Sequence, residues 1–136
     1  MISGATNSNL YAEWLNHIES EEAKDAFAYI VGLASALRDH RCHPQQKGVV
    51  RDFRFYVGET QELPFAFIPN KSWLLFYFRA PAVRGGAYLP ASVQEAFDSF
   101  VENSRGEWTV KLRCIADVKR LWRILEITDR KSTRLN

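Results

Sequence analysis

The sequence has little of what marks several common classes of protein. Its 136 residues include two cysteines, Cys42 and Cys114, which are too few for the disulfide pattern of a small secreted domain. The longest strictly apolar run, residues 73–78, is far too short to span a membrane. The amino-terminal segment MISGATNSNL has neither the basic start nor the apolar centre of a secretion signal. We therefore expect a cytoplasmic protein with reduced thiols and no membrane partner.

The motifs of common enzyme classes are also missing. The sequence contains no serine nucleophile elbow, no phosphate-binding glycine loop and no dinucleotide-binding fingerprint. The segment Arg84-Gly85-Gly86 is too short to cradle a phosphate and indicates a flexible loop. The sequence thus predicts no catalytic residue and no cofactor, and a binding role is favoured over an enzymatic one.

An excess of charge of either sign is lacking once the last eight residues are set aside. The chain has 18 basic and 16 acidic side chains, a net charge of +2. Residues 129–136, DRKSTRLN, hold three basic side chains and one acidic side chain, and so account for all of this excess. The remaining sequence is neutral, and its charge alone indicates no acidic partner.

The octapeptide DRKSTRLN resembles the translation of a sequencing-library adapter. We therefore treat residues 129–136 as a non-native tail and exclude them from the fold. The alternative is a natural basic tail that binds nucleic acid. With the first interpretation, residues 1–128 form a single domain, and we expect the natural chain to continue beyond Thr128.

What the sequence does contain is a strong pattern of helices and strands. Apolar residues at helical spacing predict helices over residues 10–18, 21–40 and 118–125, and a further helix from Ser92, whose capping box is completed by Glu95. Alternating or fully apolar runs predict strands at residues 50–58, 64–70, 72–79 and 107–113, with a loop at 80–90. The order ααβββαβα predicts an α+β domain with a mainly antiparallel, four-stranded sheet and packed helices.

Asp39-His40-Arg41-Cys42-His43 is the densest group of chemically active side chains. Imidazole and thiolate groups are zinc ligands, so a small metal-dependent enzyme that uses His40, Cys42 and His43 is the alternative function. Structural zinc sites usually draw on two separated ligand pairs, and one histidine and one cysteine remain elsewhere in the chain. We therefore interpret the segment as the end of the second helix, where histidine and arginine suit the helix dipole, and predict no metal site.

A surface is the remaining candidate for a functional site. If the strands pair as expected, one polar face of the sheet presents six basic and aromatic side chains: Arg54, Tyr56, Tyr77, Arg79, Lys111 and Arg113. Basic groups follow phosphates and aromatic rings stack on bases, so the partner would be a nucleic acid, with a protein partner as the other choice. The opposing interpretation is an ordinary solvated sheet face.

Two segments resemble a known kind of domain: FAFIPNKSWLLFYFR and GEWTVKLRCIADVKRLWRILE. The C-terminal half resembles small bacterial α+β domains of the YdhG-like kind and those described as predicted transport proteins. In those domains a strand ends in a Pro-x-Lys turn, and a Trp-bearing strand and a closing helix follow later. Pro69-Asn70-Lys71 and Trp108 take these places here. The resemblance implies a binding or accessory module, such as one that belongs to a DNA-modifying system.

Overall fold

The structure is a computed structural model that describes the backbone of residues 4–125 and the side chains of residues 9–125. The tail expected at residues 129–136 lies outside the described residues. The helices within them are α1 (Gly4–His17), α2 (Glu21–Ser35), α3 (Ala80–Arg84), α4 (Pro90–Ala96) and α5 (Ile115–Leu125). The strands are β1 (His40–Lys47), β2 (Val50–Val57), β3 (Phe65–Pro69), β4 (Leu74–Phe78), β5 (Val101–Glu102) and β6 (Trp108–Leu112).

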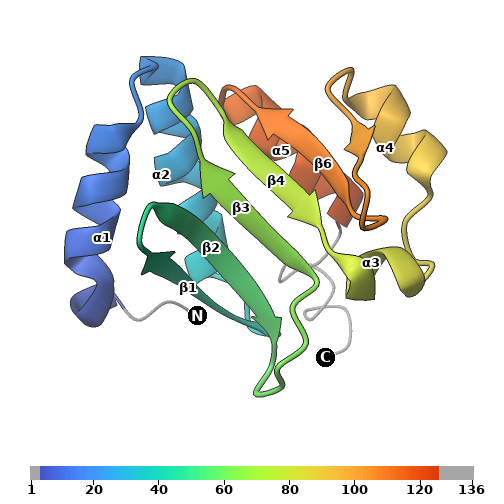
Figure 1. The fold of residues 1–136 in the computed structure, drawn as a ribbon, viewed down its shortest axis with the longest axis horizontal. Helices are drawn as coiled ribbons and strands as arrows, with labels where there is room; N and C mark the ends of the chain where they lie inside the picture. Colours follow the sequence, from blue (N-terminus) through green and yellow to red (C-terminus); the bar gives the residue numbers. More distant parts are fainter. Residues whose placement is uncertain (1–3, 126–136) are drawn as a thin grey trace.

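The strands form one antiparallel sheet with the order β1-β2-β3-β4-β6-β5 (Figure 1). The first four strands follow one another as a meander. The chain then passes through α3 and α4 and returns by β5 and β6, with β6 beside β4. The predicted α+β class and antiparallel sheet are confirmed, but the predicted number of four strands is wrong, because β1 and β5 were not foreseen.

Helices α2 and α5 pack against each other and cover one face of the sheet, behind the strands in Figure 1. Both helices carry the apolar stripe that the sequence predicts, and the sheet meets them with a layer of aromatic rings. Fully buried rings in this layer are Phe53, Phe55, Phe67, Phe76 and Phe78. Burial of such apolar surface is the main stabilising term of the fold, and the largest fully buried side chains of the sheet lie on this side.

Residues 40–47 form strand β1 and not the end of the second helix, which closes at Ser35. Strand β1 joins β2 through a tight hairpin in which Lys47 pairs with Val50 and Gly48 adopts a φ of 62°. A two-residue loop with a left-handed residue suits the twist of a hairpin. Pro44 is tolerated because β1 lies at the edge of the sheet. The prediction failed because β1 is polar and buries few side chains.

The helix expected from Ser92 begins earlier and is shorter. Helix α4 starts at Pro90, after the N-cap residue Leu89, so Ser92 lies inside it and the predicted capping box does not form. It closes at Ala96 because Phe97 is extended and its ring is 3% exposed, buried in the core. The following residues then form β5, and the loop expected at 80–90 contains the short helix α3.

Helix α1 begins at Gly4, before the predicted start at Leu10, and packs beside β1. Its fully buried Trp14 donates a hydrogen bond from Nε1 to Oε1 of Gln46, over 2.9 Å. Among residues 4–125, no helix combines the length and the apolar character needed to cross a membrane.

Candidate functional site

Among residues 4–125, no helix lies over the face of the sheet turned away from α2 and α5, which looks toward the viewer in Figure 1. Paired residues of neighbouring strands project to the same face, and one row runs from Arg54 through Ala66 and Tyr77 to Thr109. We call this surface the open face. Its side chains include Arg41, His43, Asp52, Arg54, Tyr56, Ala66, Ile68, Leu75, Tyr77, Arg79, Glu107, Thr109 and Lys111.

The structure brings most of the predicted surface residues together. Those that lie within strands and on the open face are Arg54, Tyr56, Tyr77 and Lys111. Arg79 follows β4 directly and borders a hollow in the same face. Arg113 is exposed just beyond the end of β6, where strand alternation no longer sets the direction of its side chain.

Two arginines of the open face are each held by a carboxylate. Arg54 donates from Nε to Oδ2 of Asp52 over 2.6 Å, and Arg79 donates from Nε to Oε2 of Glu107 over 2.8 Å. Glu107 also accepts a 3.1 Å hydrogen bond from Nδ2 of Asn103. These pairs offset part of the basic charge, and they fix the orientation of both guanidinium groups.

The ring of Tyr56 is enclosed and is not a free stacking surface. Arg41 lies over it at 4.8 Å, and the ring of His43 packs beside it with a centroid distance of 5.3 Å. Its hydroxyl accepts a 3.0 Å hydrogen bond from Nη1 of Arg54, and only 7% of the residue is exposed. Tyr56 therefore supports the cationic groups around it, whereas the ring of Tyr77 is only half-buried.

Lys111 places its charge over an aromatic ring near the other end of the open face. Its Nζ lies 4.2 Å from the ring centroid of Trp73, a cation–π contact. The backbone N–H of Lys111 donates to Oγ of Ser99 over 2.9 Å, which ties the segment after α4 to β6. A cationic group and a half-buried indole thus lie together at this end of the sheet.

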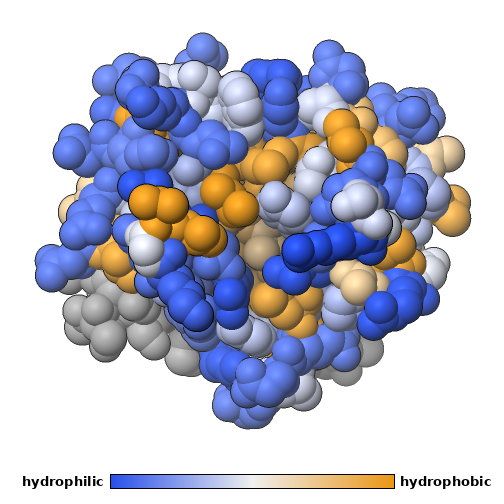
Figure 2. All heavy atoms as spheres, in the orientation of Figure 1, coloured by the Kyte–Doolittle hydropathy of each residue, from blue (hydrophilic) through white to orange (hydrophobic). Residues whose placement is uncertain are grey.

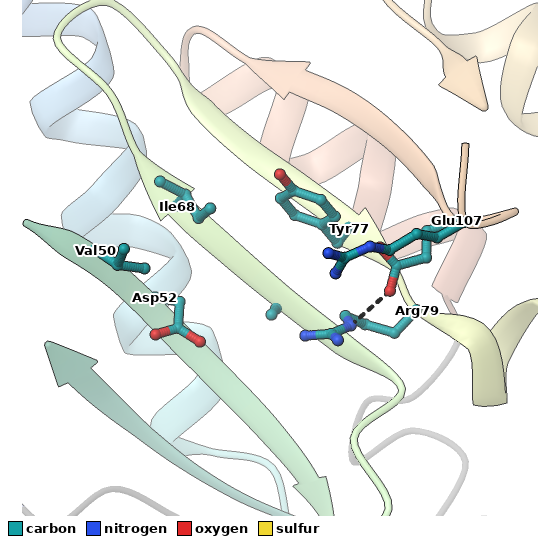
Figure 3. Close-up of a pocket in the computed structure, with 8 residues that line it drawn as sticks. Val50, Asp52, Ile68, Tyr77, Arg79 and Glu107 are labelled. Carbon is teal, nitrogen blue, oxygen red and sulfur yellow. Dashed lines mark hydrogen bonds and ion pairs between the residues drawn. The ribbon is translucent and has the colours of Figure 1, made fainter. Parts of the chain in front are cut away.

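A hollow with a volume of about 240 Å³ opens near the middle of the open face. Figure 2 shows apolar residues gathered around the middle of this face, within a mainly hydrophilic rim. The lining residues of the hollow are Val50, Asp52, Ala66, Ile68, Tyr77, Arg79, Arg105 and Glu107. In Figure 3, Asp52 and Arg79 lie on opposite sides of β3, and Tyr77 projects from β4. The small side chain of Ala66, set in a row of larger ones, leaves this space open.

Burial and neighbouring charges shift the pKa values of two side chains on the open face, Tyr77 and His43. Burial and the neighbouring carboxylate of Glu107 raise the pKa of Tyr77, so its hydroxyl stays protonated at neutral pH. Burial, together with the charges of Arg41 and Arg54, lowers the pKa of His43. His43 is therefore neutral at neutral pH and adds no charge to the face.

The cluster at residues 39–43 is divided between the two sides of the sheet. Because successive strand residues point to opposite faces, Cys42 enters the core while His43 lies on the open face. Burial raises the pKa of the Cys42 thiol to about 12, so it stays protonated. Within residues 4–125 the structure does not gather three or more His, Cys, Asp or Glu side chains as metal ligands. The alternative metal site thus has no assembled ligand set in this part of the chain.

Comparisons with models of protein families, with curated proteins and with solved structures find no match for this chain.

Several residues of this site are not those that the sequence predicts. Arg41 and His43 were assigned to a helix end, although the Gly48 turn ahead of a strongly alternating strand is a hairpin signal that points back to β1. The partnership of Glu107 with Arg79 gave no signal, since 28 positions separate them along the chain.

Proposed function

We propose that this protein is a binding module that takes a single-stranded nucleic acid on its open face. The observation that carries the proposal is a sheet face that no helix of the described part of the chain covers, and that combines cationic side chains with a half-buried tyrosine. The cations on or beside this face are Arg41, Arg54, Arg79, Arg105 and Lys111. Asp52 and Glu107 pair with Arg54 and Arg79, and Glu59 lies 3.8 Å from Arg41. The excess of positive charge therefore comes from Arg105 and Lys111.

Nucleic acid suits this surface better than an acidic peptide because of an aromatic ring. Guanidinium and ammonium groups attract any polyanion, but the half-buried ring of Tyr77 offers a contact that a base can stack on. A single strand exposes its bases for such contacts, whereas a duplex hides them in its stack. By its resemblance to known accessory domains, such a module would serve a nucleic-acid-modifying system.

The test is a salt titration of binding, measured by fluorescence anisotropy with a dye-labelled thymidine 12-mer. The double variant Arg105→Gln/Lys111→Gln removes two charges beside the hollow and Trp73. If both contact phosphates, the slope of log K against log salt falls by about 1.4, since each single-strand phosphate contact contributes about 0.7.

The matched control is Lys119→Gln/Arg123→Gln, which removes the same two residue types from exposed positions on α5, on the far side of the sheet. We expect this control to keep the parent slope. The proposal is wrong if the parent protein does not bind the 12-mer at about 50 mM salt, a concentration at which phosphate contacts are strong. It is equally wrong if both double variants lose affinity to the same extent.

A further inference from the structure

The hollow in the open face has the size of a site for one ring system. Its volume of about 240 Å³ falls below the roughly 300–1,000 Å³ usual for sites that enclose a whole small molecule or cofactor. Its apolar surface comes mainly from Val50 and Ile68, because Ala66 beneath them is only 3% exposed. Tyr77 adds an aromatic ring beside this surface. A flat, partly apolar group could therefore settle against the sheet here.

One wall of the hollow is a hydrogen-bond donor with a fixed orientation. Glu107 holds Nε of Arg79 at 2.8 Å and is itself held by Asn103. The two terminal nitrogens of Arg79 make no hydrogen bond with any residue of the described part of the chain. An arginine anchored at Nε presents its remaining N–H groups as a planar fork, which matches two adjacent acceptors.

The opposite wall is an acceptor. Asp52 lies on β2, across β3 from Arg79, and its Oδ2 accepts the hydrogen bond from Nε of Arg54 (Figure 3). Within residues 9–125, Oδ1 of Asp52 has no hydrogen-bond donor. A carboxylate has about four lone-pair positions, so Asp52 can accept two further hydrogen bonds while it still holds Arg54.

The geometry points to one unpaired guanine base of a bound strand as the occupant of this hollow, an inference that rests on the proposed function. Guanine offers O6 and N7 as adjacent acceptors for the Arg79 fork, and N1–H and the N2 amino group as adjacent donors for Asp52. The base would lie against Ile68 and Tyr77.

The other bases fit this pair of walls less well. Adenine presents its N6 amino group where guanine has O6, and its N1 acceptor faces a carboxylate. Cytosine and thymine each present a single donor group to Asp52. When the wrong base enters, donors and acceptors of the site lose their hydrogen bonds to water and gain none to the base. Such a site discriminates strongly between bases.

The experiment compares thymidine 8-mers that carry one central substitution, again by anisotropy. We expect a strand with one guanine to bind about tenfold more tightly than the strands with adenine, cytosine or thymine, as one well-formed bidentate contact implies. Replacing guanine by 7-deazaguanine removes the N7 acceptor, and replacing it by hypoxanthine removes the N2 amino group. Each replacement should lose most of the preference, the first through Arg79 and the second through Asp52.

Two variants link the preference to the walls. Arg79→Lys keeps the charge but not the planar fork, and Asp52→Asn replaces an acceptor by an amide. Each should bring the ratio of guanine to thymine affinities close to one, while the control Lys119→Gln keeps the full ratio. Tryptophan fluorescence of each variant confirms the fold, and if Asp52→Asn loses it, Arg79→Lys and the base analogues still decide the question.

The outcomes separate the two proposals. Failure of every strand to bind overturns the proposed function and this inference with it. Two outcomes overturn the inference but not the binding function. The first is tight binding with equal affinity for all four bases, and the second is a guanine preference that remains in Arg79→Lys and Asp52→Asn. Loss of the preference with both base analogues and in the variants supports it.

Discussion

Replacing Glu107 by glutamine removes a buried charge that pairs with Arg79 on the open face. The side chain of Glu107 is 8% exposed, and its Oε2 lies 2.8 Å from Nε of Arg79. Glutamine keeps nearly the same size and still accepts a hydrogen bond. The change therefore isolates the contribution of the carboxylate charge and leaves the packing in place.

The magnitude follows from burial and solvent screening. A hydrogen bond between charged groups contributes about 1.5–3 kcal/mol to the free energy of unfolding when its partners are buried. Because the side chain of Arg79 is 34% exposed, water compensates part of this loss. We expect Glu107→Gln to lower the free energy of unfolding by about 1.5 kcal/mol. A double-mutant cycle with Arg79→Met should give a coupling energy of about 1 kcal/mol.

The assay is urea unfolding, followed by tryptophan fluorescence at neutral pH. With a slope of about 1.5 kcal/mol per molar urea, the midpoint should fall by about 1 M. Glu59→Gln is the control, because Glu59 is 96% exposed and lies 3.8 Å from Arg41, so its midpoint should not move. Equal midpoints for Glu107→Gln and the parent, or a coupling energy of zero, would show that this ion pair does not stabilise the fold.

Further predictions concern the core, the thiols and pH. Phe67→Ala should cost about 3–5 kcal/mol of unfolding free energy, because the ring is fully buried among other rings; a loss below about 1 kcal/mol would contradict this packing. A thiol reagent should label half-buried Cys114 in the native protein and reach Cys42 only in urea, since Cys42 is fully buried; rapid labelling of both would refute the burial. The lowered pKa of His43 means that the unfolded chain binds a proton first as pH falls through 6.5, so its contribution to stability is present above that pH and is lost below it. The pKa values of His17 and His40 are lowered as well, so His43→Gln should make this part of the pH–stability curve less steep without removing its slope. An unchanged curve would rule the contribution of His43 out.

The sequence predicted those elements that carry a long apolar stripe of their own. The alternation of Phe53 and Phe55 in β2, and the helical spacing of Val118 and Leu121 in α5, follow directly from which side chains the core buries. Such patterns are local, because each element must turn one side toward the core wherever its neighbours lie.

The missed elements have no such stripe. Strand β5 has two residues and exists because Val101 and Glu102 pair with β6. Strand β1 is polar, and its place is set by the hairpin and by its pairing with β2. The conformation of a strand at the edge of a sheet depends on its pairing with the neighbouring strand, so its own sequence gives only a weak strand pattern.

Some features of the candidate site also follow from the sequence, and others depend on the tertiary structure. By itself the sequence determined that Arg54 and Tyr56 share a face of one strand, and that Lys111 lies on a polar side of another, because side chains alternate along every strand. Only the tertiary structure decided that β6 lies beside β4, which brings Glu107 to Arg79. It also decided that α2 and α5 cover one side of the sheet, while no helix within residues 4–125 covers the other. The physical reason is that alternation depends on backbone geometry within a strand, whereas strand order depends on how the whole chain buries its apolar surface.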